Sequence, residues 1–91
     1  MKSNNFMKEA LNQAKLAFEN DEVPVGAVIV ENGEIIATSH NKNILLKDST
    51  AHAEILALRQ ACLFKNSHRL DNCDIYITLE PCPMCASAIS L

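Results

Sequence analysis

The stretch VGAVIVENGEIIATS, residues Val25 to Ser39, decides the fold of this chain. Residues 25–30 are rich in β-branched side chains and nearly unbroken in their apolarity, which predicts a strand buried on both faces. The pair Asn32-Gly33 is typical of a type I′ turn, because both central residues of that turn need a positive φ. We therefore expect residues 35–39 to be the antiparallel partner of a central strand.

Helices are expected on both sides of this hairpin. Over residues 5–19 apolar side chains recur at helical spacing while charged and amide side chains fall opposite, which predicts an amphipathic helix. After the hairpin, the polar stretch 40–48 indicates a loop. Residues 48–50 are three suitable N-caps for a second helix, which is expected to end near Leu63.

The remainder of the chain predicts one more strand and one more helix. Cys73–Leu79 is the strand, and residues 81–91 begin the helix. The order α-β-β-α-β-α predicts the α/β class: a three-layer α/β/α sandwich in which a right-handed strand-helix-strand crossover extends the hairpin. Because the sequence stops at Leu91 within an apolar helix start, we expect residues 1–91 to be a single but incomplete domain.

Composition excludes several classes of protein. The chain has 91 residues, of which 48% are hydrophobic and 21% charged, and no apolar run approaches the length that spans a bilayer. The N-terminus has no secretory signal, so the expected location is the cytoplasm. The net charge of −3 argues against a strongly basic nucleic-acid platform but leaves room for a local basic rim.

Two short motifs indicate a metal site. The first is Thr50-Ala51-His52-Ala53-Glu54, and the second is Glu80-Pro81-Cys82-Pro83-Met84-Cys85. A catalytic zinc site takes three protein ligands and leaves one position for water, and one histidine with two cysteines matches that number. Cysteines three residues apart on the first turn of a helix share a face, and the helix N-terminus stabilises their thiolates.

The carboxylate of Glu54 adds acid–base chemistry to this ligand set. Zinc lowers the pKa of its bound water toward neutrality, and a free carboxylate beside that water can move its proton to a substrate and a leaving amine. His52 and Glu54 point in nearly opposite directions inside a helix, so one site can use both only around the first turn. The expected reaction is the hydrolytic removal of an amino group.

His52-Ala53-Glu54 and Pro81-Cys82-Pro83-Met84-Cys85 resemble the H-x-E and P-C-x-x-C signature of the zinc nucleoside and nucleobase deaminases. Within that superfamily the chain is most similar to the bacterial tRNA-specific adenosine deaminases, through residues 22–28, 41, 48–59 and 78–80. Ser49 departs from the proline that commonly stands there. A larger departure is the absence of the family's C-terminal half.

The resemblance implies a role for each of seven residues. One zinc per chain would be bound by His52, Cys82 and Cys85, with Glu54 as the proton shuttle; Asn41 would hydrogen-bond a flipped base in a pocket lined by Val23 and Leu79. The implied reaction converts adenosine to inosine at the wobble position of a tRNA anticodon stem-loop, in a homodimer whose second copy helps to hold the RNA. The implied sheet is mixed, in the order 2-1-3-4-5 with strand 1 antiparallel to its neighbours, and only strands 1 to 3 are present.

Other interpretations remain open. A guanine or cytosine deaminase acting on the free base or nucleoside would use the same zinc motif, and an inactive zinc-binding fragment would retain it. A Cys-x-x-Cys at a helix start also suits a thioredoxin-like redox module, although that leaves the His-x-Glu motif unexplained. Cys62 and Cys73 are expected to be small core residues, and His40 and His68 exposed loop residues.

Overall fold

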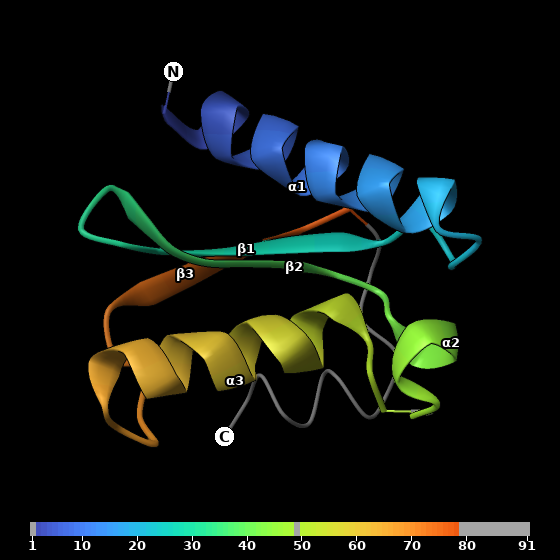
Figure 1. Cartoon of the computed structure of the whole chain (residues 1–91). Helices are drawn as coiled ribbons and strands as arrows, with labels where there is room; N and C mark the ends of the chain where they lie inside the picture. Colours follow the sequence, from blue (N-terminus) through green and yellow to red (C-terminus); the bar gives the residue numbers. More distant parts are fainter. Residues whose placement is uncertain (1, 49, 79–91) are drawn as a thin grey trace.

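The computed structural model describes residues 2–48 and 50–78. The elements, in chain order, are α1 (Lys2–Glu19), β1 (Gly26–Glu31), β2 (Glu34–His40), α2 (Asn43–Leu46), α3 (Ala53–Lys65) and β3 (Cys73–Ile77). Helix α1 lies on one face of the three-stranded sheet and α3 on the other (Figure 1). The three-layer α/β/α arrangement is therefore confirmed for these elements, whereas the expected third helix falls outside the described residues.

β1 is the central strand of the sheet. The strand order is β2-β1-β3, and β1 runs antiparallel to both neighbours, as the resemblance implied. Alternate side chains of β1 enter different cores: Ile29 packs toward α3, whereas Val28 packs toward α1. Both are almost completely buried, at 1% and 0% exposure, so the prediction of a strand buried on both faces is confirmed.

The hairpin turn has the predicted backbone conformation. Asn32 has a φ of 51° and Gly33 a φ of 80°, so both central residues occupy the region that a type I′ turn requires. The register runs from Gly26 opposite His40 to Glu31 opposite Glu34, with one irregularity after Ile29.

Small residues let both helices approach the sheet closely. On α3, Ala53, Ala57 and Ala61 form a fully buried stripe against the sheet. On the other face, a Cβ placed on Gly26 would lie 2.0 Å from the backbone oxygen of Ala10, so the α1 backbone rests directly on the start of β1. Glycine is the residue that fits this crossing.

The start of α3 differs from the prediction. The helix begins at Ala53 with His52 as its N-cap, rather than at residues 48–50. Asp48 is already engaged before the helix, because its Oδ1 accepts the backbone N–H of Thr50 at 2.9 Å and the Thr50 hydroxyl at 2.7 Å. These hydrogen bonds lower the pKa of Asp48 below its ordinary value. Asp48 and Thr50, which were expected to cap the helix, therefore stabilise the turn that precedes it.

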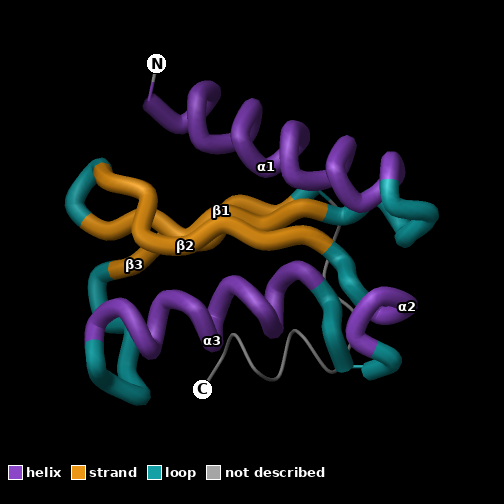
Figure 2. Tube along the Cα trace, in the orientation of Figure 1, coloured by secondary structure: helices purple, strands orange, loops and turns teal. Residues whose placement is uncertain are grey.

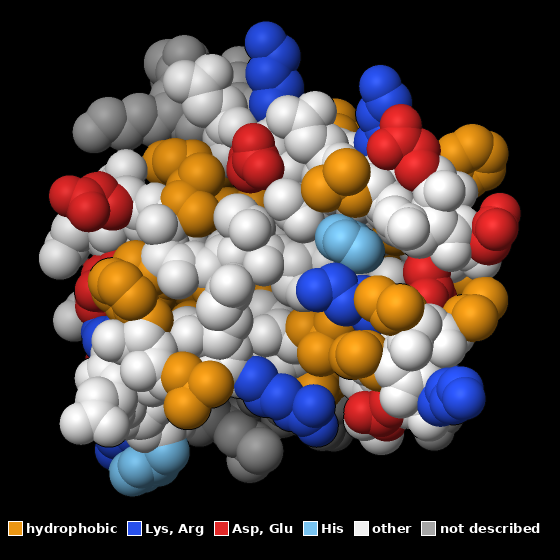
Figure 3. Space-filling model, in the orientation of Figure 1, with side chains coloured by type: hydrophobic (Ala, Val, Ile, Leu, Met, Phe, Trp, Pro, Cys, Tyr) orange, Lys and Arg blue, Asp and Glu red, His pale blue; other side chains and the backbone are white. Residues whose placement is uncertain are grey.

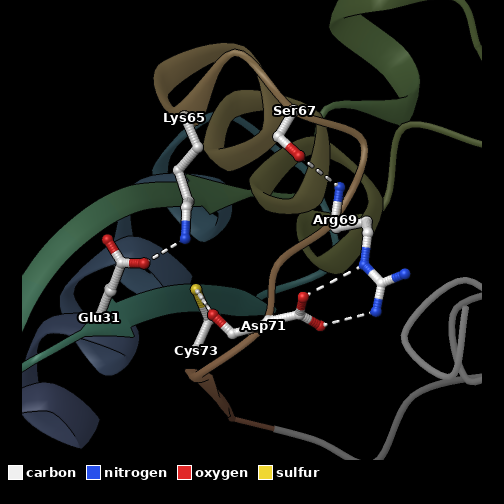
Figure 4. Close-up of polar contacts among 6 residues, drawn as sticks. All are labelled: Glu31, Lys65, Ser67, Arg69, Asp71 and Cys73. Atoms are coloured by element: carbon white, nitrogen blue, oxygen red, sulfur yellow. Dashed lines mark hydrogen bonds and ion pairs between the residues drawn. The ribbon is translucent and has the colours of Figure 1, made fainter.

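Polar contacts also join α3 to the sheet where β1 ends and β3 begins (Figure 4). Lys65, at the end of α3, forms an ion pair with Glu31 of β1, and this contact raises the pKa of the Lys65 ammonium. Cys73 packs against the α3 side of the core and its thiol donates to the Asp71 carbonyl, while burial raises the thiol pKa. Cys62 and Cys73 are both reduced and half-buried rather than fully buried.

The surface of the described part is mixed in character. On the face drawn in Figure 3, lysine and arginine side chains stand singly among acidic and apolar ones instead of gathering into a stripe. No helix within residues 2–48 and 50–78 has the length and apolarity needed to cross a membrane.

Candidate functional site

One edge of the sheet gathers the predicted site residues. β2 and β3 both end here and β1 begins here, since Gly26 pairs with His40 and Ala27 pairs with Ile77. The Gly26 N–H also donates to the Thr78 hydroxyl oxygen at 3.2 Å. Figure 2 shows the loop that leaves β2, the short helix α2 and the start of α3 at this same edge.

Asn41 joins the end of β2 to the start of α3. Its backbone N–H donates to the Val25 carbonyl at 3.1 Å, and its side-chain Oδ1 accepts the Ala53 N–H at 2.7 Å. The side chain thus satisfies one of the amides that every helix leaves unpaired in its first turn. His52, the N-cap, makes no such side-chain bond. Asn41 is 6% exposed, so this is a buried cap supplied from 12 residues away.

His52 and Glu54 lie together at the first turn of α3. His52 has an extended backbone, with φ −78° and ψ 151°, and its carbonyl accepts the first helical N–H, from Leu56, at 3.0 Å. Because His52 precedes the regular helix, helical spacing does not force its side chain away from that of Glu54. Glu54 is 4% exposed, and the helix N-terminus favours a carboxylate in the first turn.

The predicted zinc ligands are described only in part. His52 is half-buried at the edge just outlined, whereas Cys82 and Cys85 lie outside the described residues, as does the pocket residue Leu79. Within residues 2–48 and 50–78, no three histidine, cysteine, aspartate or glutamate side chains come close enough to hold a metal. An imidazole at the N-cap of α3 and a buried carboxylate in its first turn are side chains of the types that the expected site requires.

Two features of this edge were absent from the sequence prediction. Helix α2 stands inside the stretch expected to be a loop, and the Glu22 carboxylate binds its first turn. The available signal was the aliphatic run Ile44-Leu45-Leu46, which is too short to predict a helix. Val23, predicted to line the base pocket, is 60% exposed and directly follows Glu22.

A family model for the cytidine and deoxycytidylate deaminase zinc-binding region matches residues 1–91. The tRNA-specific adenosine deaminase of Aquifex aeolicus is 56% identical over 86 residues, which cover 94% of this chain and 57% of the relative. The enzyme of the same name from Bacillus subtilis is 52% identical over 86 residues, or 94% of this chain and 53% of the relative. The chain thus spans little more than half the length of these two relatives.

Solved structures share the fold. A structure from a study of A-to-I editing by tRNA:A34 deaminases superposes with a TM-score of 0.96 at 51% identity, covering 99% of this chain and 69% of the other. Guanine deaminase from Bacillus subtilis superposes with a TM-score of 0.94 at 42% identity, covering 99% and 58%. These comparisons confirm the predicted fold.

Proposed function

Because this chain belongs to the cytidine and deoxycytidylate deaminase zinc-binding family, we propose that it catalyses the zinc-dependent hydrolytic deamination of adenosine to inosine at a tRNA anticodon wobble position. The observation that carries the proposal is the junction at the start of α3. His52 is the N-cap of α3, Glu54 is buried in its first turn, and Asn41 is hydrogen-bonded to the same turn. The names of the relatives then favour adenosine in tRNA as the substrate.

The metal would be held by His52, Cys82 and Cys85, one zinc per chain. Bound there, zinc would supply a Lewis acid that lowers the pKa of a water molecule at its open position. The extended backbone of His52 at the N-cap supports this role, because it frees the side chain from helical spacing. Cys82 is four residues beyond Thr78 in the sequence, and Thr78 pairs with Gly26 at this edge of the sheet.

Glu54 would move the protons of the reaction. Its carboxylate accepts a proton from the attacking water, delivers it to a ring nitrogen of the base, and transfers the second water proton to the departing amine. The oxygen of water becomes bonded to C6, the bond between C6 and the exocyclic amino nitrogen breaks, and ammonia leaves. Burial of Glu54 at 4% exposure shields this transfer from bulk water.

Asn41 would hold the base against this carboxylate, with Val23 and Leu79 lining the pocket. Its Oδ1 already accepts the Ala53 N–H, so its Nδ2 amino group is the donor available for an acceptor atom of the base. Flipped-out bases are commonly recognised by such side-chain hydrogen bonds together with apolar contacts.

A catalytic assay would test this proposal. We expect the protein to release ammonia from an anticodon stem-loop RNA and to leave inosine at the wobble position, with no turnover of free bases. Glu54→Gln should lower the rate by about 10²-fold or more, since one positioned acid–base group contributes that much. Glu34→Gln, at an exposed position of the hairpin, is the matched control. Equal rates for Glu54→Gln and wild type would refute the role of Glu54.

Substitution of three cysteines would test the zinc ligands. Cys82→Ser or Cys85→Ser should abolish zinc binding, whereas Cys73→Ser should retain one zinc per chain, as measured by elemental analysis. Retention of zinc by all variants would refute the assignment. A reversible disulfide in a zinc-free protein would instead support the thioredoxin-like alternative.

Guanine deaminase is the second candidate function, because a guanine deaminase superposes over 99% of this chain with a TM-score of 0.94. Turnover of free guanine with no inosine in RNA would favour it. Zinc binding without any ammonia release would favour an inactive zinc-binding fragment. The homodimer, its binding of a tRNA anticodon stem-loop and its location in the cytoplasm stay predictions. Mass measurement of the native protein would test the dimer.

A further inference from the structure

Glu22 is a buried carboxylate to which the proposed reaction gives no role. It lies in the connection between α1 and β1, where its own N–H donates to the Ala17 carbonyl at 2.9 Å. Its side chain reaches across to α2: Oε1 and Oε2 each lie 3.1 Å from the Ile44 backbone nitrogen, and Oε2 accepts the Leu45 N–H at 2.9 Å. The residue is 6% exposed. A carboxylate so buried and bonded is committed to these two amides.

Helix α2 depends on polar contacts to keep its place. It has four residues, far fewer than an isolated helix needs for stability, and none of them is buried. Ile44, Leu45 and Leu46 are 67%, 68% and 49% exposed, so apolar packing contributes little to holding them. The other hydrogen bonds of α2 within the described residues are local and join it to Lys42, Lys47 and Asp48. Glu22 therefore supplies the long-range attachment of α2 to the body of the protein.

The segment that Glu22 holds is continuous with Asn41. One residue, Lys42, separates Asn41 from α2; its N–H donates to the Ala51 carbonyl at 2.9 Å and its carbonyl accepts the Leu46 N–H at 2.9 Å. Lys42 thus connects α2 both to Asn41, which directly precedes it, and to Ala51, two residues before Ala53. The N–H and side-chain hydrogen bonds of Asn41 itself go to Val25 and Ala53, so α2 can act on Asn41 only through this covalent connection.

We propose that Glu22 is a positioning residue: by binding the first turn of α2 it holds the Asn41 side chain against the start of α3. This inference goes beyond the proposed deamination, on which its consequence for the substrate rests. In the enzyme, Glu22 would fix the donor that meets the base without touching the base itself. Its removal should loosen α2 first and Asn41 second.

Amide hydrogen exchange of the zinc-loaded protein tests the structural step without any substrate. In Glu22→Ala the amides of Ile44 and Leu45 should exchange about tenfold faster or more, as expected when charge-assisted hydrogen bonds are lost. The Ala53 amide, bonded to Asn41, should also lose protection. Glu22→Gln, which retains an acceptor of the same length, should give an intermediate result, and Glu34→Gln should match wild type. Glu22→Gln also serves if the alanine variant fails to fold.

Two outcomes of the exchange experiment would overturn the inference. Unchanged protection at Ile44 and Leu45 would show that Glu22 does not hold α2. Faster exchange at those two amides with an unchanged exchange rate at the Ala53 amide would show that Glu22 holds α2 but does not position Asn41.

Steady-state kinetics tests the consequence for the substrate. Glu22→Ala should raise KM for the stem-loop RNA about tenfold with a smaller change in kcat, because the affected contact is one that binds the base, and Glu22→Gln should restore part of the loss. A fall in kcat of about tenfold with KM unchanged would contradict the positioning role. Absence of ammonia release by wild type would refute the proposed function alone, since the exchange measurement still decides how Glu22 acts.

Discussion

Replacing Asn41 by alanine should destabilise the protein by about 1–3 kcal/mol, because it leaves the Ala53 N–H buried without an acceptor. The bond that is lost measures 2.7 Å, and its asparagine is 6% exposed, so water cannot readily replace the side chain. In a domain of this size each kcal/mol corresponds to about 4–8 °C in Tm. Urea and thermal unfolding, at a fixed zinc content, would measure the change.

Asn43→Ala is the matched control for this substitution. The Asn43 side chain also makes a hydrogen bond, donating to the Asp48 carbonyl at 3.0 Å, but that carbonyl additionally accepts the Ala51 N–H at 3.1 Å. No group is left unpaired, so the cost should stay near about 0.5–1 kcal/mol. An equal loss of stability in Asn43→Ala and Asn41→Ala, or continued protection of the Ala53 amide from exchange in Asn41→Ala, would contradict the capping role of Asn41.

Three further predictions follow from other parts of the molecule. Gly26→Ala should cost about 1–3 kcal/mol or more in unfolding free energy, since its Cβ would lie 2.0 Å from the Ala10 carbonyl oxygen; a denaturation midpoint equal to that of wild type would contradict the close crossing. In an NMR titration the pKa of the Asp48 carboxyl should lie below its ordinary value of 3.8 and should return toward that value in Thr50→Val, whereas an ordinary pKa in wild type would exclude the Thr50 hydrogen bonds. The contribution of this carboxylate to stability is present above pH 3.8 and is lost as the pH falls through the lowered pKa. Removal of zinc by a chelator should lower Tm, because ligands that bind the folded state stabilise it, and re-addition of zinc should restore it; an unaltered Tm would argue against a metal coupled to folding.

Much of the fold could be predicted because its signals are local. The helical spacing of apolar residues along α1 and the unbroken β-branched run of β1 depend on neighbouring residues alone. The positive φ values at Asn32 and Gly33 follow from their residue types. These features determine a hairpin with a helix packed on it. The His-x-Glu motif likewise predicted that site residues lie at the start of α3, and Glu54 is buried there.

What only the tertiary structure decided is the partner of each buried polar group. Asn41 accepts from an amide 12 residues away, and Glu22 binds amides 22 and 23 residues away. Neither pairing has a periodicity or a spacing that a linear pattern contains, because the partner is set by where the folded chain returns. The same reason explains why the start of α3 was misplaced: Asp48 and Thr50 are good caps by type, but the cap that acts on Ala53 comes from the end of β2. The sequence by itself determined the layers of the fold and the types of side chain at the start of α3. The hydrogen bonds that position those side chains form only in the folded chain.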